Sequence, residues 1–74
     1  MLNPKDKILI VGLGLIGGSY AEALTDGGFT VGAIDVDKES IDYALEKGII
    51  KDGTVNADED YISRFDVIIF ALFP

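Results

Sequence analysis

Three glycines with the spacing G-x-G-x-x-G constrain this chain more than any other feature. Gly12, Gly14 and Gly17 come directly after an apolar run, Ile8 to Val11, and lead into a segment of helical period. A short apolar run that ends at glycine is typical of a strand buried on both faces of a parallel sheet. The sequence therefore predicts a tight turn that joins a buried strand to a helix.

The predicted first helix shows one apolar face, with side chains at helical spacing: Ile16, Tyr20, Ala23 and Leu24. The pair Gly27-Gly28 is expected to end it, because glycine suits the left-handed conformation after a helix. Strand-forming residues from Phe29 to Ile34 predict a second strand, and Asp35 lies at its end.

The second half of the chain continues this alternation. Asp37 is a good N-cap for a second helix, and Gly48 is its expected end. Asp52-Gly53 is typical of a turn, and residues 58–63 of a short helical turn. Val67 to Ala71 predicts a third buried strand. The order β-α-β-α-β indicates the α/β class, with a Rossmann-type parallel sheet and right-handed crossovers. With 74 residues there is room for one of the two halves of such a fold, so we expect a truncated half-domain.

An acid at the end of the second strand indicates that the glycine loop binds a dinucleotide. Asp35 lies 23 positions after Gly12, and the dinucleotide-binding fingerprint expects an acid about 20 residues on. In that fingerprint Gly12 permits the tight turn, Gly14 lets a pyrophosphate approach the backbone, and Gly17 lets the helix pack closely. The alternative is that the glycines serve a tight turn alone, which leaves Asp35 unexplained.

The fingerprint also assigns the remaining contacts of the nucleotide. The free N–H groups of the first helical turn, near Leu15 and Ile16, are expected to face the phosphates, with help from the helix dipole. Asp35 is expected to accept hydrogen bonds from the ribose hydroxyls. A carboxylate there favours NAD, because NADP needs a nearby Arg, and only Lys38 follows Asp35 closely as a cation.

Two further positions have two interpretations each. Asp37 is either a contact for the cofactor or the N-cap of the second helix. Ala71, with Leu72-Phe73 after it, follows the third strand at the edge where such sheets bind ligands. These residues either border the nicotinamide half of the cofactor or give hydrophobic cover.

Composition narrows the possible partners and the chemistry. The net charge is −7 without a basic stretch, which argues against nucleic acid and anionic membrane surfaces as partners. The longest apolar run, Val67 to Pro74, is far short of the ~20 residues that span a bilayer. The absence of cysteine and of a visible signal peptide fits the cytoplasm. Because the chain has no histidine, the commonest general acid or base, we assign no catalytic residue. We assign no metal site, because there is no cysteine to supply a thiolate and the adjacent acids Asp58-Glu59-Asp60 are typical of a solvated loop.

Two segments resemble the prephenate and arogenate dehydrogenase family. The loop from Gly12 to Ser19, with its double glycine followed by serine, resembles the family's phosphate loop. The segment from Ala44 to Thr54 resembles the stretch after the second helix of that family, and Asp66 to Ala71 is compatible with it. The resemblance implies a parent enzyme that oxidatively decarboxylates prephenate to 4-hydroxyphenylpyruvate in tyrosine biosynthesis and passes a hydride to NAD.

The same resemblance makes residues 1–74 the N-terminal portion of a dinucleotide-binding domain, without the family's helical catalytic domain. Alone, the chain is then expected to be inactive. The alternatives are a stand-alone NAD-binding module and the cofactor domain of another Rossmann dehydrogenase, of the arogenate, hydroxyacid or pyrroline-carboxylate type. An uncovered sheet also predicts self-association, because free strand edges tend to pair.

Overall fold

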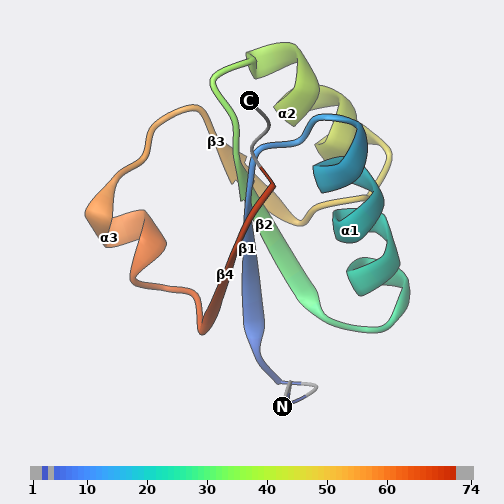
Figure 1. Cartoon of the computed structure of the whole chain (residues 1–74), viewed down its shortest axis with the longest axis vertical. Helices are drawn as coiled ribbons and strands as arrows, with labels where there is room; N and C mark the ends of the chain where they lie inside the picture. Colours follow the sequence, from blue (N-terminus) through green and yellow to red (C-terminus); the bar gives the residue numbers. More distant parts are fainter. Residues whose placement is uncertain (1–2, 4, 72–74) are drawn as a thin grey trace.

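The computed structural model describes Asn3 and residues 5–71, which form a single sheet flanked by helices (Figure 1). The strands are β1 (Lys7–Val11), β2 (Thr30–Ile34), β3 (Asp52–Thr54) and β4 (Val67–Phe70). The helices are α1 (Leu15–Asp26), α2 (Lys38–Glu46) and α3 (Glu59–Ile62). Strands and helices alternate along the chain from β1 to β4, as predicted.

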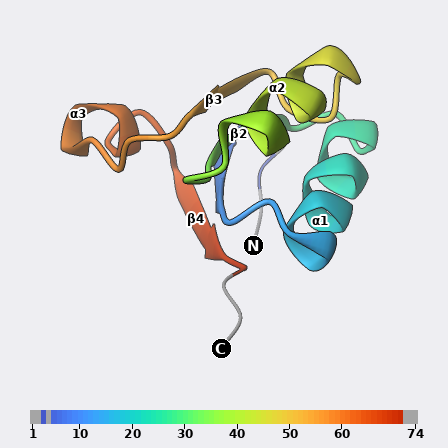
Figure 2. The same cartoon turned by 90° about the horizontal axis from the view of Figure 1, so that it is seen from above.

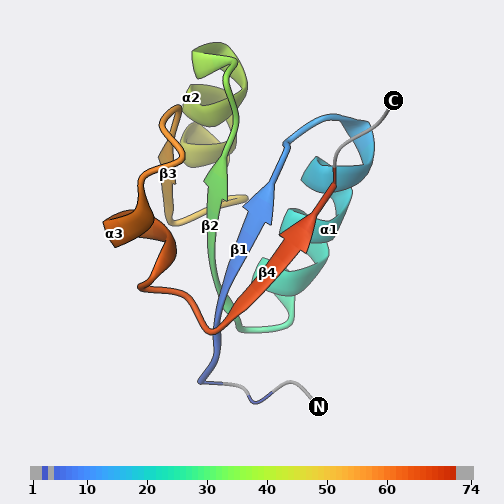
Figure 3. The ribbon, with the colours of Figure 1, turned by 60° about the vertical axis from the view of Figure 1, so that its left-hand side comes forward.

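All neighbouring strands run parallel, in the order β3-β2-β1-β4 (Figure 3). This is the order of the first four strands of a doubly wound dinucleotide-binding sheet. The predicted α/β class and Rossmann-type parallel sheet are therefore confirmed. Strand β2 lies on one side of β1 and β4 on the other. Because these strands are parallel, their carboxyl ends lie together at the same end of the sheet.

Strand β3 contradicts the predicted turn at Asp52-Gly53. These residues pair with Gly32 and Ala33 of β2, and the order of elements becomes β-α-β-α-β-α-β. Asp and Gly are poor strand formers, so local propensity favours a turn there. Tertiary packing overrides this preference. Gly53 fits beneath Ile41 and Ile50 because it has no side chain, since a Cβ there would lie 2.9 Å from Ile50 and 3.0 Å from Ile41.

The helices lie on both faces of the sheet. Figure 2 shows α1 and α2 on one side and α3 on the other. The main core lies under α1 and α2 and contains ten buried residues: Ile8, Ile10, Leu13, Ala21, Val31, Ala33, Ile41, Ala44, Ile50 and Ala71. The central strand β1 is buried on both faces, as predicted, since Ile8, Leu9 and Ile10 are fully buried.

Helix α1 packs on the sheet through a different face from the one predicted. Its buried residues are Gly17 and Ala21, while Ile16 and Tyr20 are 46% and 52% exposed. Small residues face the sheet because the helix lies very close to it. The larger apolar side chains one position away are displaced towards solvent. The predicted apolar face of Ile16, Tyr20 and Ala23 is therefore not the buried face of α1. Leu24, the fourth residue of that face, does pack against the core.

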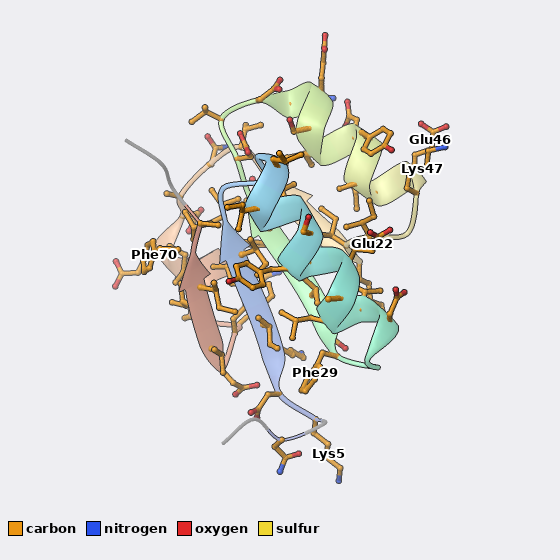
Figure 4. The ribbon with its side chains drawn as sticks, turned by 45° about the vertical axis from the view of Figure 1, so that its right-hand side comes forward. Lys5, Glu22, Phe29, Glu46, Lys47 and Phe70 are labelled. Carbon is orange, nitrogen blue, oxygen red and sulfur yellow. The ribbon has the colours of Figure 1, made fainter. Side chains whose placement is uncertain are left out.

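Strand β4 is only half-buried, which contradicts the predicted third buried strand. Its side chains alternate, with Val67 and Ile69 packed against the core and Ile68 and Phe70 exposed. Phe70 is 69% exposed and points away from α1 and α2 (Figure 4). Because β4 ends the strand order, one side of it has no neighbouring strand within the described residues.

The described residues include no helix that is long and apolar enough to span a membrane.

Candidate functional site

The glycine loop begins at the carboxyl end of β1. Gly12 has a φ of +101°, which L-residues with a side chain rarely adopt. Its N–H donates to the Ile34 carbonyl oxygen at 2.8 Å, so the loop starts against the end of β2. The chain then enters α1 at Leu15. The tight turn predicted for Gly12 is therefore present in the structure.

Gly17 lets α1 approach the loop closely. A Cβ on Gly17 would overlap the carbonyl oxygen of Gly12 and lie 3.1 Å from the Cβ of Ala71. The obstacle is largely backbone, so no side-chain movement could relieve it. The close packing predicted for Gly17 is accordingly present, and it fixes the start of α1 over the ends of β1 and β4.

Gly14 lacks both of these explanations. Its φ of −62° is ordinary for any residue, and a Cβ there would meet nothing within 4 Å. Neither backbone strain nor packing within the described chain therefore requires a glycine. The space beside Gly14 is open, as it must be if a ligand is to reach the backbone.

The N-terminus of α1 is uncapped. No side chain of the described residues accepts from its first N–H groups, and its first turn contains no acid. The helical hydrogen bonds begin at Gly18, whose N–H donates to the Gly14 carbonyl oxygen at 2.8 Å, so the N–H groups of Leu15 and Ile16 precede them. By contrast, aspartate side chains cap α2 and α3. At α1 the free N–H groups and the helix dipole therefore favour an anion.

The Asp35 carboxylate lies beside this loop at the end of β2. Its Oδ2 accepts the Leu13 N–H at 2.7 Å, and its Oδ1 accepts the Asp37 N–H at 2.9 Å. The Asp35 N–H in turn donates to the Thr54 carbonyl oxygen of β3 at 3.2 Å. Asp35 is half-buried, and the two hydrogen bonds hold its carboxylate against the loop. Each oxygen keeps acceptor capacity, because a carboxylate oxygen has two lone pairs.

The structure places Asp37 at the N-terminus of α2, as its N-cap. One carboxylate oxygen accepts the Glu39 N–H at 3.2 Å, and the other accepts the Ser40 hydroxyl at 2.8 Å. The capping interpretation is confirmed. A contact between Asp37 and the cofactor stays a prediction.

Lys38, the cation nearest to Asp35 in the sequence, is paired with another residue. Its Nζ lies 2.8 Å from Oδ2 of Asp42, one helical turn further on. This hydrogen bond and the Asp42 charge raise the pKa of Lys38. Both side chains are exposed, so the pair is weak. In the described structure Lys38 therefore points its charge along α2.

Ala71 follows β4 and is 8% exposed. Its N–H donates to the Val11 carbonyl oxygen at 2.8 Å, and its methyl group faces Gly17. Packing therefore accounts for Ala71, and its contact with the nicotinamide half stays a prediction. Leu72 and Phe73, which share that prediction, lie outside the described residues.

An open groove of about 520 Å³ runs from the glycine loop between α1 and α2. Its polar lining includes Ser19 and Glu22 of α1 and Glu39 and Tyr43 of α2. Figure 4 shows Glu22 on the side of α1 that faces α2. The sequence reasoning missed this groove, and it also missed the Leu13 and Thr54 backbone groups that hold Asp35. No sequence signal marks a backbone donor, and the role of Thr54 depends on the unexpected strand β3.

Comparison with known proteins agrees with this geometry. A family model of the NAD-binding domain of 6-phosphogluconate dehydrogenase matches residues 7–73. The chain belongs to this family of NAD-binding domains. NAD, the cofactor expected from Asp35, is the one for which the family is described, so that expectation is confirmed.

A solved structure shares the fold of this NAD-binding domain. It is prephenate dehydrogenase from A. aeolicus in complex with hydroxyphenyl propionate and NAD+. The two are 32% identical with a TM-score of 0.80, and the match covers 93% of this chain. The predicted resemblance to the NAD-binding part of that family is thereby confirmed. The match covers 24% of the enzyme, so the domain spans about a quarter of its length.

Proposed function

We propose that this domain binds NAD across the glycine loop and serves as the cofactor-binding part of a prephenate dehydrogenase. The single observation that carries the cofactor site is Gly14, whose missing side chain leaves open space at the uncapped start of α1. The Asp35 carboxylate lies next to that space, tied to Leu13. A dinucleotide needs these two features side by side, because its pyrophosphate and its ribose are adjacent.

In this proposal the chain binds and orients the cofactor. The N–H groups of Leu15 and Ile16 donate to the pyrophosphate, and Asp35 accepts from the ribose hydroxyls. Gly12 and Gly17 shape the loop. Asp37 and Ala71 border the site, and each also has the structural role described above. When bound, NAD supplies the hydride acceptor of the reaction, while substrate binding and proton transfer lie with residues outside this chain.

Selectivity for NAD follows from charge. A 2′-phosphate would meet the Asp35 carboxylate, with Asp37 next to it and no Arg beside it. Calorimetric titration of the 74-residue chain with NAD and with NADP tests the cofactor proposal, with circular dichroism to verify the fold. Saturable binding that is at least about tenfold tighter for NAD agrees with it, since one unfavourable charge contact costs about that factor. A folded chain that binds neither nucleotide, or binds both equally, contradicts it.

The substrate is the second part of the proposal, and its support is the 32% identity to prephenate dehydrogenase. The family description names 6-phosphogluconate dehydrogenase instead, and a stand-alone NAD-binding module or a hydroxyacid, arogenate or pyrroline-carboxylate enzyme shares the same cofactor site. A chimera tests this, with the domain replacing the matched quarter of the A. aeolicus enzyme. NAD-dependent oxidation of prephenate by the chimera supports the proposal. A folded, NAD-binding chimera without that activity contradicts it.

We further propose that the domain works in the cytoplasm and self-associates through β4. The support for self-association is an outer strand with four apolar residues, no charge and an exposed Phe70. Sedimentation should show a dimer at high protein concentration, and Phe70→Lys should shift it to monomer. A monomer at every concentration contradicts this.

A further inference from the structure

We infer that Asp35 is a positioning residue for the phosphate loop, in addition to its proposed contact with the ribose. By holding the Leu13 N–H, its carboxylate keeps the first N–H groups of α1 in the orientation that binds a pyrophosphate. The inference rests on the proposed function of the loop as a pyrophosphate site. It means that pyrophosphate binding depends on Asp35, although the Asp35 side chain does not contact the phosphates.

Two other contacts restrain the ends of the loop, the hydrogen bond from the Gly12 N–H to Ile34 and the packing of Gly17 on Gly12, and Leu13 lies between them. Leu13 lies between two glycines, which allow a wide range of backbone conformations. Its side chain is buried in the core, and its N–H donates to Asp35 Oδ2 at 2.7 Å. That distance is short for an N–H···O bond, as expected with a charged acceptor. This hydrogen bond is the restraint on the Leu13 backbone closest to the free N–H groups of α1.

Asp35 is itself firmly held, so it can act as an anchor. Oδ1 accepts the Asp37 N–H at 2.9 Å, and the Asp35 backbone N–H donates to Thr54 of β3 at 3.2 Å. A continuous series of hydrogen bonds therefore runs from β3 through Asp35 to Leu13, one residue before the N-cap of α1. Movement of the Leu13 backbone would break the shortest hydrogen bond in this series.

Binding of a ligand that has no ribose distinguishes two cases: Asp35 positions the phosphate loop, or Asp35 contacts the ribose and nothing else. A carboxylate near an anion site repels the anion, so removing its charge should strengthen binding of inorganic pyrophosphate if Asp35 acts on the ribose alone. If Asp35 positions the loop, loss of its acceptor should weaken pyrophosphate binding even though the charge has gone.

Two neutral variants separate charge from hydrogen bonding. Asp35→Asn removes the charge and keeps one oxygen acceptor, which binds the Leu13 N–H when the amide NH2 group is turned towards Asp37. Asp35→Ala removes the charge and both acceptors. Glu22→Gln serves as a charge control, because it removes a negative charge from the groove beside the loop without changing any residue of the proposed cofactor site. Each variant of the whole chain is titrated with inorganic pyrophosphate by calorimetry. Amide hydrogen exchange of Leu13 is measured by NMR without ligand.

We expect Leu13 to exchange about tenfold faster in Asp35→Ala than in wild type or Asp35→Asn, as loss of a hydrogen bond to a charged group implies. Pyrophosphate should bind about tenfold more weakly to Asp35→Ala than to Asp35→Asn, and at least as tightly to Glu22→Gln as to wild type. If Asp35→Ala does not fold, Asp35→Ser, whose side chain is too short to reach Leu13, takes its place.

Equal pyrophosphate binding by Asp35→Ala and Asp35→Asn overturns the inference, and so does unchanged Leu13 exchange. Faster exchange without any pyrophosphate binding to wild type also overturns the positioning role. Failure of the proposed function is recognised separately, because it would appear as a folded wild-type chain that binds neither NAD nor pyrophosphate.

Discussion

The Asp35 carboxylate accepts the Leu13 backbone N–H at 2.7 Å, and this bond joins the end of β2 to the loop that follows β1. The two strands are neighbours in register, with Val11 opposite Ile34. Their loops therefore leave the sheet side by side. Parallel pairing of β1 and β2 thus brings Asp35, which is 22 residues from Leu13 in the sequence, to the loop that contains Gly14.

Gly14 and Gly17 should respond differently to the same substitution. Gly17→Ala should lower the free energy of unfolding by about 1–3 kcal/mol, because the new methyl group overlaps the Gly12 carbonyl oxygen. Gly14→Ala meets no atom of the described chain and should cost less than about 1 kcal/mol, the difference between glycine and alanine at an N-cap. Urea unfolding of both variants measures these changes.

Gly14→Ala should affect NAD binding strongly, although it should affect stability less than Gly17→Ala does. Gly14→Ala should fold and lose at least about tenfold in NAD affinity, because the methyl group occupies the space that the pyrophosphate needs. Gly18→Ala is the matched control, since a Cβ there would lie 3.7 Å from the Leu13 carbonyl oxygen, an ordinary contact. Unchanged NAD affinity in a folded Gly14→Ala variant would show that the open space at Gly14 is not part of the site.

Asp37 should matter more for stability than for cofactor binding. Asp37→Ala removes the acceptor for the Glu39 N–H and should lower the free energy of unfolding by about 1 kcal/mol, while Asp37→Asn retains the cap. Thermal unfolding compares the two. NAD affinity of Asp37→Asn should stay within about twofold of wild type; a larger loss would assign Asp37 a direct contact with the cofactor.

Val36 offers a route to altered cofactor selectivity. It follows Asp35 directly and is 91% exposed, so its replacement removes no packing. Val36→Arg should raise NADP affinity relative to NAD, because an Arg beside the ribose accommodates a 2′-phosphate. Its unfolding free energy should change by less than about 0.5 kcal/mol. Val36→Gln, of similar length without the charge, is the control. An unchanged ratio of the two affinities would place the ribose away from Asp35.

Ionisation of Tyr61 should lower the free energy of unfolding as the pH rises above 10. Burial raises the pKa of Tyr61 to about 12, and the Asp52 charge adds to the rise, whereas the Arg64 charge opposes it. Between pH 10 and 12 the unfolded chain loses this proton first, so the folded state binds more protons and its stability falls as pH rises. Below pH 10 this contribution is fully present.

Tyr61→Phe tests that dependence. The Tyr61 hydroxyl is buried and makes no hydrogen bond within the described part of the chain. Removing it should raise the free energy of unfolding by about 1 kcal/mol at neutral pH and reduce the loss between pH 10 and 12. Tyr43→Phe, at an exposed tyrosine, is the control. Denaturant unfolding at pH 8, 10 and 11.5 gives the comparison. A steeper loss in Tyr61→Phe than in wild type would be inconsistent with this assignment.

The glycine loop was predictable because its requirements are local. The run Ile8 to Val11, the spacing of Gly12, Gly14 and Gly17, and the position of Asp35 together indicate a strand, turn, helix and second strand in fixed order. The α/β class follows from that alternation. Caps were also predictable, since Asp37 accepts the Glu39 N–H as a helix N-cap should.

The errors arose where distant packing overrides local preference. Strand β3 exists because Gly53 fits under Ile41 and pairs with β2, which no local pattern signals. The buried face of α1 follows from the close approach of Gly17 to Gly12, and so Ala21 faces the sheet in place of Tyr20. The hydrogen bond from Leu13 to Asp35 involves a backbone donor, which any residue type would supply.

An NMR titration of the ¹⁵N-labelled chain with NAD tests the cofactor site most directly. The amide signals of Leu13 to Gly17 and of Asp35 and Val36 should shift in a saturable manner. NADP at the same concentrations should produce much smaller shifts. Saturable shifts confined to other parts of the chain, such as the groove residues Glu22 and Tyr43, would contradict the account, as would a folded chain without any shifts.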